Sequence, residues 1–319
     1  MSEVIMRVEN LTKKFPVSDG KFLTACDDIT FDVVKGETVG IVGESGCGKT
    51  TLLKAIMNMQ KPTSGKIIFH GEDITQLTGE AKRQNYRRIQ MIFQDPTAAF
   101  NPKMKIRDII CEPLLNFDLI AKSEVDAKAR ELLTQVDLPA DFVERYPHNM
   151  SGGQRQRVAI ARALALEPEV IACDEATSAL DVSVQDTIIK LLVKLQREKG
   201  ITYIFICHDL ALVSMFSHKI AVMYLGNIME KIDGDKLSGA RHPYTHALLK
   251  AVFSTEREKN QYIEILPGEI PSPLDVPSGC PFRNRCTYCQ EICTTQKPPF
   301  EEIENNHFVA CHYPLNKAH

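Results

Sequence analysis

The sequence predicts an α/β fold that contains a helical subdomain and ends in a small extension rich in cysteine and proline. In residues 1–235, short apolar segments of strand length alternate with amphipathic stretches, which is the pattern of α/β proteins. A glycine-rich phosphate-binding pattern lies between one such strand and a helix. Eight of the 17 prolines and five of the ten cysteines lie beyond residue 266. We therefore expect two domains, residues 1–235 and 236–319, with the helical subdomain at about 95–165.

The expected elements follow from the spacing of apolar residues along the chain. Thr38 to Val42 is predicted to be a buried strand, and a helix is expected from Lys49 to Met59. The apolar residues from Ser123 to Tyr146 have helical periodicity, which predicts the helical subdomain. A long helix is expected from Gln154 to Leu166. The later strands are expected at Val170 to Asp174, Thr202 to Cys207 and Ile220 to Tyr224.

Composition excludes several classes of protein. Of 319 residues, 44% are hydrophobic and 25% are charged, so wholesale disorder is not expected. No apolar run approaches the roughly 18 residues that span a bilayer, and the N-terminus lacks the apolar core of a signal peptide. A net charge of −3 gives no basic footprint for nucleic acid. We expect a chain on the cytoplasmic side, soluble or peripheral to a membrane, whose cysteines are thiols or metal ligands.

The residues from Gly43 to Thr50 fit the phosphate-loop pattern G-x-x-x-x-G-K-S/T. Glycines let backbone N–H groups close around phosphate oxygens, and the following helix N-terminus adds partial positive charge. Lys49 supplies a cation, and the Thr50 hydroxyl can bind Mg²⁺. A chance glycine-rich turn is the alternative, but the flanking strand and helix favour a nucleotide site. The candidate ATP-binding residues are Gly43, Ser45, Gly46, Cys47, Gly48, Lys49, Thr50 and Thr51.

Two carboxylates end the apolar segment that begins at Val170. Asp174 is the candidate Mg²⁺ residue, and Glu175 is the candidate general base that polarises an attacking water. The alternative is an exposed acidic turn after a strand, which would give the same sequence pattern. The upstream phosphate loop makes the catalytic interpretation the stronger one.

A second anion-binding helix N-terminus is predicted where Ser151, Gly152, Gly153 and Gln154 open a long helix. An ordinary capped helix is the alternative. One nucleotide does not need two such cradles in a single chain. With this motif, residues 4–235 resemble the ATP-binding cassette ATPases, in which the S-G-G-Q signature of one subunit closes on the γ-phosphate held by the partner subunit. Met150 and Ala176 depart from the commoner leucine and proline of that family.

The resemblance implies roles for further residues. Gln94 would sense Mg²⁺ and the attacking water and contact the transmembrane partner, while His208 would read the γ-phosphate. Asp181, in the loop from Ser178 through Ala179 and Leu180, would couple the two active sites. Phe15 is the expected adenine-stacking residue, with Phe22 as a rival.

The tail resembles the C-terminal extension of oligopeptide and dipeptide importer ATPases over residues 240–315. The matching segments are His242 to Leu249, Leu266-Pro267-Gly268-Glu269 and Gly279 to Phe282. That family also contains nickel importers and usually pairs two different ATPases. The residues within the motifs resemble those of the second, or "F", member of the pair.

Four cysteines in the tail, Cys280, Cys286, Cys293 and Cys311, follow the spacing C-x5-C-x6-C-x17-C. In some members of the family such a set holds a 4Fe–4S cluster, and thiolates suit that metal centre. The pair Cys286 and Cys289 has zinc-like spacing, so Zn²⁺ and free thiols are the alternatives. A structural role is expected, because a proline-rich segment with little core gains rigidity from a metal.

The predicted function is the ATP-hydrolysing motor of an importer that takes up di- and oligopeptides, with ATP and Mg²⁺ as cofactors. The expected partners are a second ATPase subunit in a heterodimer, two transmembrane permeases and an extracellular solute-binding protein. A nickel or other small-solute importer is the alternative within the family. A soluble cassette ATPase acting on ribosomes or nucleic acid is disfavoured, because such proteins typically carry two cassettes or basic insertions. An iron–sulfur redox regulator would not need Glu175 and His208.

Overall fold

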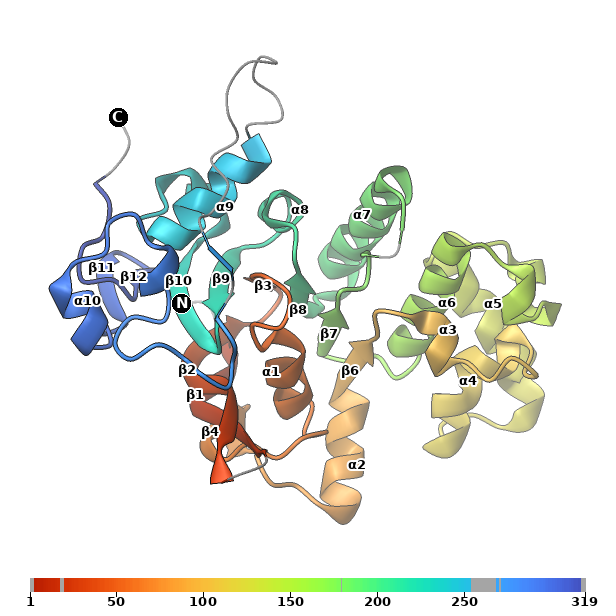
Figure 1. The fold of residues 1–319 in the computed structure, drawn as a ribbon. Coiled ribbons are helices and arrows are strands. Elements are labelled where there is room, and N and C mark those ends of the chain that lie inside the picture. The colour runs from red at the N-terminus through yellow and green to blue at the C-terminus, as the bar shows by residue number, and fades with distance from the viewer. Residues whose placement is uncertain (1–2, 18–19, 179, 254–267, 270, 317–319) are drawn as a thin grey trace. The chain divides into compact units, whose positions relative to one another are not determined.

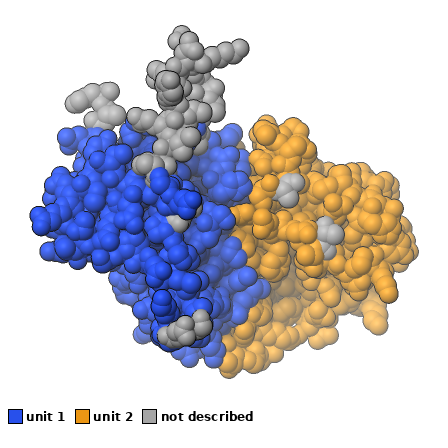
Figure 2. Space-filling view, viewed as in Figure 1, with its two compact units in different colours: residues 1–76, 205–319 blue, residues 77–204 orange. Residues whose placement is uncertain are grey.

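The computed structural model describes residues 3–17, 20–178, 180–253, 268–269 and 271–316, so Ala179, Leu266 and Pro267 lie outside the described residues. The chain forms two compact units, which Figure 2 colours separately. Unit 1 contains residues 1–76 and 205–319, and unit 2 contains residues 77–204. The grouping differs from the expected boundary after residue 235, because the last cassette strands and the extension fall in the same unit.

Unit 1 contains two groups of paired strands (Figure 1). Strands β1 and β2 form a long antiparallel pair that continues to β4 and β5. In the second group, β3 runs parallel to β9, with Val39 opposite Lys219 and Val42 opposite Val222. The strands of the first group and of the β3–β9 pair are β1 (Val4–Pro16), β2 (Phe22–Val34), β3 (Thr38–Val42), β4 (Ser64–Phe69), β5 (Glu72–Asp73) and β9 (Lys219–Tyr224).

The extension adds strands to this second group. Strand β10 (Asn227–Asp233) pairs antiparallel with β9 and with β12 (His307–Val309), and β12 pairs with β11 (Glu301–Glu304). Phe282 and Val309 are buried. The few buried apolar residues of the proline-rich tail pack against the cassette, as the Phe282 ring does at 5.3 Å from the Tyr224 ring of β9. The helices of unit 1 are α1 (Lys49–Ile56), α8 (Leu210–Ser214), η5 (Gly234–Gly239), α9 (Pro243–Phe253), η7 (Arg283–Arg285) and α10 (Glu291–Thr295).

Unit 2 contains a short parallel strand pair and most of the helices. Strand β6 (Ile89–Ile92) runs parallel to β7 (Val170–Asp174), with Ile89 opposite Val170. Helices α4, α5 and α6 contact one another and form the expected helical subdomain. The helices are α2 (Gly79–Arg88), α3 (Pro96–Ala99), α4 (Ile106–Asn116), η2 (Lys122–Glu124), α5 (Val125–Gln135), η3 (Ala140–Glu144), η4 (Pro147–Asn149), α6 (Gly152–Leu164) and α7 (Val182–Lys199).

Most predicted elements form where the sequence placed them. Strands β3 and β7 have the predicted bounds, as does β8 (Thr202–Cys207), which contains the boundary between the units. The helical stretch from Ser123 to Tyr146 is interrupted: α5 ends at Gln135, and a 3-10 turn begins after Pro139. The interruption has a local cause, because a proline disfavours helical backbone in the residue before it. Among the described residues, no helix has the length and apolar character to span a bilayer.

Candidate nucleotide site

The phosphate loop of unit 1 connects β3 to α1. Its glycine at position 48 caps α1 with φ at 107°, in the left-handed region that side chains rarely adopt. A Cβ at this position would lie 1.9 Å from the carbonyl oxygen of Ala25, on β2. The loop therefore needs glycine here for conformation and for close approach, as a phosphate cradle does.

Lys49 is buried and bends back over the loop. Its Nζ donates to the carbonyl oxygens of Gly43, at 2.7 Å, and of Glu44, at 3.0 Å. Since the first N–H groups of a helix lack intrahelical partners, the start of α1 offers donors beside this ammonium. The loop can therefore bind phosphate oxygens without a change in its backbone conformation.

The remaining predicted loop residues line the same turn. Ser45 and Gly46 are exposed, whereas Thr50 and Thr51 are half-buried in the first turn of α1. Cys47 is buried, and burial raises the pKa of its thiol despite the neighbouring Lys49 ammonium. Its side chain is therefore a neutral packing group.

Two residues of the extension contact the loop at Glu44. The guanidinium of Arg285 donates to both carboxylate oxygens, at 2.6 and 3.1 Å, and the Tyr244 hydroxyl accepts from the Glu44 N–H at 3.1 Å. Neither contact was predicted from the sequence. They join residues 200 and 241 positions apart, so no local spacing could have revealed them.

Unit 1 also holds the predicted histidine and the two candidate aromatic residues. His208 is exposed immediately after β8. Phe15 and Phe22 lie at the same end of the β1–β2 pair, where Phe15 is opposite Leu23 and Phe22 is opposite Pro16. The Phe22 side chain is 57% exposed, and the Lys13 ammonium lies 4.9 Å from the Phe15 ring centre. Both rings remain candidates for stacking on a base.

In unit 2 the structure brings together Gln94, Glu175 and Ser178. The Gln94 amide donates to a Glu175 carboxylate oxygen at 3.1 Å and to the Ser178 hydroxyl at 3.3 Å. Glu175 has a φ of 47°, which is uncommon for a residue other than glycine and is often found at functional sites. Asp174, at the end of the wholly buried strand β7, is 8% exposed. This arrangement can orient a water molecule for attack beside a carboxylate.

The predicted signature opens helix α6 in unit 2. Ser151 is the N-cap: its hydroxyl accepts from the Gln154 N–H at 3.3 Å, and the Gln154 side chain accepts from the Ser151 N–H at 3.0 Å. Gly153 packs closely on α7, since a Cβ there would lie 2.6 Å from a methyl of Val184. The signature therefore forms the helix N-terminus that the sequence predicted, suited to an anion.

The Asp181 side chain caps α7 in the same unit. It accepts from the Val184 N–H at 3.0 Å and from the Ser183 hydroxyl at 2.6 Å. Those hydrogen bonds, the one from Ser183 foremost, lower the pKa of the Asp181 carboxyl. The loop before α7 is thus fixed by a charged cap.

The four predicted cluster cysteines line one pocket in unit 1, together with His242 and Phe282. Burial raises the pKa of the Cys280 thiol to about 12 and that of the Cys311 thiol to about 11. The pocket that these residues line has a volume of about 10 Å³, and the described part of the chain contains no group of His, Cys, Asp and Glu arranged to hold a metal ion. The structure therefore gives no support to the predicted metal site. Cys289 is exposed.

Two known families match separate parts of the chain. Residues 26–178 match the family described as "ABC transporter", and residues 233–293 match "Oligopeptide/dipeptide transporter, C-terminal region". The first match contains the phosphate loop, the signature and the carboxylates. The second contains Tyr244 and Arg285. The two family resemblances seen in the sequence are confirmed.

Curated relatives match over nearly the whole length. The chain is 46% identical to the oligopeptide transport ATP-binding protein AppF of Bacillus subtilis and 44% identical to the oligopeptide transport ATP-binding protein OppF of Haemophilus influenzae, covering 97% of this chain and 97% of each relative. The predicted likeness to the "F" member of the pair is therefore confirmed.

Solved structures share the fold. The dimeric ATP-binding cassette MJ0796, in a post-hydrolysis state bound to ADP and Pi, has a TM-score of 0.65 at 30% identity and covers 72% of this chain and 98% of its own. CbiO1 from Clostridium perfringens, part of the ABC transporter complex cbiONQ, has a TM-score of 0.66 at 27% identity and covers 80% and 97%. The chain therefore belongs to the ATP-binding subunits of the oligopeptide and dipeptide ABC transporters and is an ABC-type ATPase.

Proposed function

We propose that this chain is the motor subunit of a peptide importer and works face to face with a second cassette. One observation carries the proposal: the chain has one phosphate loop, before α1, but a second anion-binding helix N-terminus at α6. A single bound nucleotide would leave the second unused. Two chains would instead complete two composite pockets, each with one loop and one signature. That MJ0796 is a dimer bound to ADP and Pi supports this arrangement.

In the proposed pocket the loop from Gly43 to Thr51 holds the phosphates, and Phe15 or Phe22 stacks on adenine. Thr50, Gln94 and Asp174 are the proposed Mg²⁺ residues, since hydroxyl, amide and carboxylate oxygens suit this hard cation. When bound, Mg²⁺ neutralises phosphate charge. Ser151 to Gln154 serve the nucleotide of the partner subunit.

Catalysis is proposed to depend on Glu175 as the general base. Its hydrogen bond from Gln94 fixes the orientation of the carboxylate for a water molecule. His208 contacts the γ-phosphate, and Asp181 couples the two pockets. The domain boundary after residue 235 is kept as a proposal, and the second family match from residue 233 supports it.

The glutamate assignment is tested by Glu175→Gln in the assembled transporter. The amide oxygen can still accept from Gln94 but is a poor base, so ATP turnover should fall by roughly 10²–10⁴ while ATP affinity is unchanged. Turnover is measured as phosphate release and affinity by nucleotide titration. Lys49→Ala is the matched control, since it removes the buried cation and should weaken ATP binding itself. Wild-type turnover in Glu175→Gln would refute the assignment.

The proposed partners are a second ABC ATPase, two permease subunits and an extracellular solute-binding protein, which place the chain at the cytoplasmic face of a membrane. The names of the relatives, oligopeptide transport ATP-binding proteins, support this assignment. Affinity purification from detergent-solubilised membranes should recover two hydrophobic permeases and a second cassette. Recovery of ribosomal RNA instead would favour a soluble ATPase acting on ribosomes.

Di- and oligopeptides are the proposed cargo, with nickel or another small solute as the alternative within the family. Cells lacking this chain should lose uptake of a labelled tripeptide, and expression of the chain should restore it. If ⁶³Ni uptake falls and peptide uptake does not, the nickel alternative replaces the proposal.

A metal in the cysteine pocket is also a proposal. The convergence of four thiols on one pocket supports a 4Fe–4S cluster, or Zn²⁺ as its alternative, whereas the small space between them favours free thiols. Anaerobic purification tests it: absorbance near 400 nm with stoichiometric iron and sulfide supports the cluster. Colourless protein with one zinc indicates Zn²⁺, and metal-free protein indicates thiols.

A further inference from the structure

The second residue of the phosphate loop, Glu44, is held from outside the cassette. Its carboxylate receives two hydrogen bonds from Arg285, and its backbone N–H donates to Tyr244. Both partners belong to the part of the chain that matches the C-terminal region of peptide transporters. The extension therefore contacts both the main chain and the side chain of Glu44 in the phosphate loop.

Both partners are themselves fixed in place. The Arg285 and Tyr244 side chains are buried, and Arg285 ends the short turn η7, where its N–H donates to the Phe282 carbonyl at 3.0 Å. The Phe282 ring lies 5.2 Å from the Tyr244 ring and 5.3 Å from the Tyr224 ring. A buried aromatic cluster thus positions both groups that hold Glu44.

The position of Glu44 matters for Lys49. The carbonyl oxygens of Gly43 and Glu44 accept from the Lys49 ammonium, so a shift of residue 44 moves one acceptor of the cation that serves the phosphates. Pre-ordering of a loop lowers the entropy lost when a ligand binds. Contacts that hold residue 44 therefore favour nucleotide binding.

We propose that Arg285 and Tyr244 are positioning residues of the phosphate loop, through which the C-terminal extension sets the affinity of the chain for MgATP. This inference rests on the proposed nucleotide site. It gives the extension a role in nucleotide binding in addition to its structural role, in which β11 and β12 extend the paired strands of unit 1.

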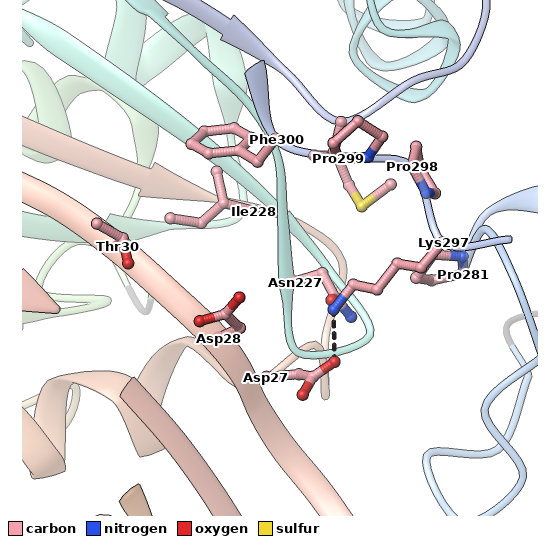
Figure 3. Close-up of a pocket in the computed structure, with 12 residues that line it drawn as sticks. Asp27, Asp28, Thr30, Asn227, Ile228, Pro281, Lys297, Pro298, Pro299 and Phe300 are labelled. Carbon is pink, nitrogen blue, oxygen red and sulfur yellow. Dashed lines mark hydrogen bonds and ion pairs between the residues drawn. The ribbon is translucent and has the colours of Figure 1, made fainter. Parts of the chain in front are cut away.

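The structure offers a matched control in a second ion pair between extension and cassette. Lys297 contacts Asp27 of β2 at 2.6 Å, as Figure 3 shows, beside a pocket of about 250 Å³. The pair joins the same two parts of the chain as Arg285 and Glu44 but does not contact the phosphate loop. Its loss should leave the loop unchanged.

The test is titration of the full-length chain with a fluorescent ATP analogue in the presence of Mg²⁺. Arg285→Met should weaken binding by about tenfold, within the usual range for coupling between linked sites, whereas Lys297→Met should bind as the wild type does. Glu44→Gln should weaken binding to a similar extent, and the double variant Glu44→Gln/Arg285→Met no further, because both changes break the same ion pair. Arg285→Lys should recover part of the affinity.

The outcomes separate this inference from the proposed site. If the wild type binds the analogue and Lys49→Ala does not, the nucleotide site holds. Equal affinity of Arg285→Met and wild type then overturns the positioning role. So does equal weakening by Lys297→Met, which would indicate a general structural effect. If circular dichroism shows that Arg285→Met does not fold, Tyr244→Phe replaces it: it removes only the hydroxyl, and unchanged affinity would again overturn the inference.

Discussion

The phosphate loop of unit 1 and the signature of unit 2 are both glycine-rich turns at helix N-termini, yet they are held in different ways. The helix cap of the signature is made by neighbours in sequence: Ser151 and Gln154 cap each other, three residues apart, and Gly153 packs on a distant residue, Val184. The phosphate loop is fixed by distant segments, namely Ala25 against Gly48 and residues 244 and 285 at Glu44. A helix cap can be built from a few residues, whereas a loop with several exposed backbone donors needs support from elsewhere in the fold.

The difference has a consequence for how each region responds to change. Substitution of Ser151 in the signature should act through a local cap hydrogen bond. A substitution in or around the phosphate loop should disturb contacts between segments that come together only on folding.

The largest effect is expected from Gly48→Ala. The new Cβ would lie within 1.9 Å of the Ala25 carbonyl in a backbone with φ at 107°, so the loop or β2 must move, at a cost of about 4 kcal/mol, in the upper tail of point mutations. Gly46→Ala is the control: it shares a positive φ, 78°, but nothing lies within 4 Å, so it should cost only about 1 kcal/mol. Urea denaturation measures both. Equal destabilisation would show that contact with β2 does not support the loop.

An intermediate effect on stability is expected from pH, through His242, which lies next to the phosphate-loop contact Tyr244. Burial lowers the pKa of His242 to about 4, and its Nδ1 accepts from the Tyr244 N–H at 3.0 Å, which requires the neutral ring. The unfolded chain, with a histidine pKa near 6.5, binds the proton more readily. Stability is therefore full above pH 6.5 and falls by up to about 3 kcal/mol as the pH drops to 4.

The variant His242→Asn tests this assignment. Its amide oxygen can accept from Tyr244 but does not titrate, so the loss of stability between pH 7 and pH 5 should be smaller than in the wild type. Urea midpoints at the two pH values provide the measurement. Parallel losses in both proteins would exclude His242 as the source.

The smallest effect is expected from Ser151→Ala. It removes the acceptor for the Gln154 N–H and should cost about 1 kcal/mol. Thr78→Ala is the matched control in the same unit, because Thr78 is the N-cap of α2 but makes no side-chain cap hydrogen bond. It should cost less than Ser151→Ala. The comparison between the two regions would fail if Ser151→Ala destabilised the protein as strongly as Gly48→Ala.

Much of the fold was predictable because its signals are local. Strands β3 and β7 are buried runs with the predicted bounds, and α6 begins beside its capping serine. The hairpin of β11 and β12 was missed, since its two strands have only seven residues with little periodicity, and β12 is defined by its pairing with β10. The cysteine spacing indicated that four thiols would meet, which they do, but not the size of the pocket between them.

The order of residues alone determined the family, the nucleotide motifs and the helix caps, because each depends on residues a few positions apart in a pattern of fixed spacing. The tertiary structure decided what supports the phosphate loop. Arg285 and Tyr244 reach Glu44 because η7 and α9 fold back onto the cassette. The free energy of such contacts comes from burial shared among segments that are 200 or more residues apart in the sequence.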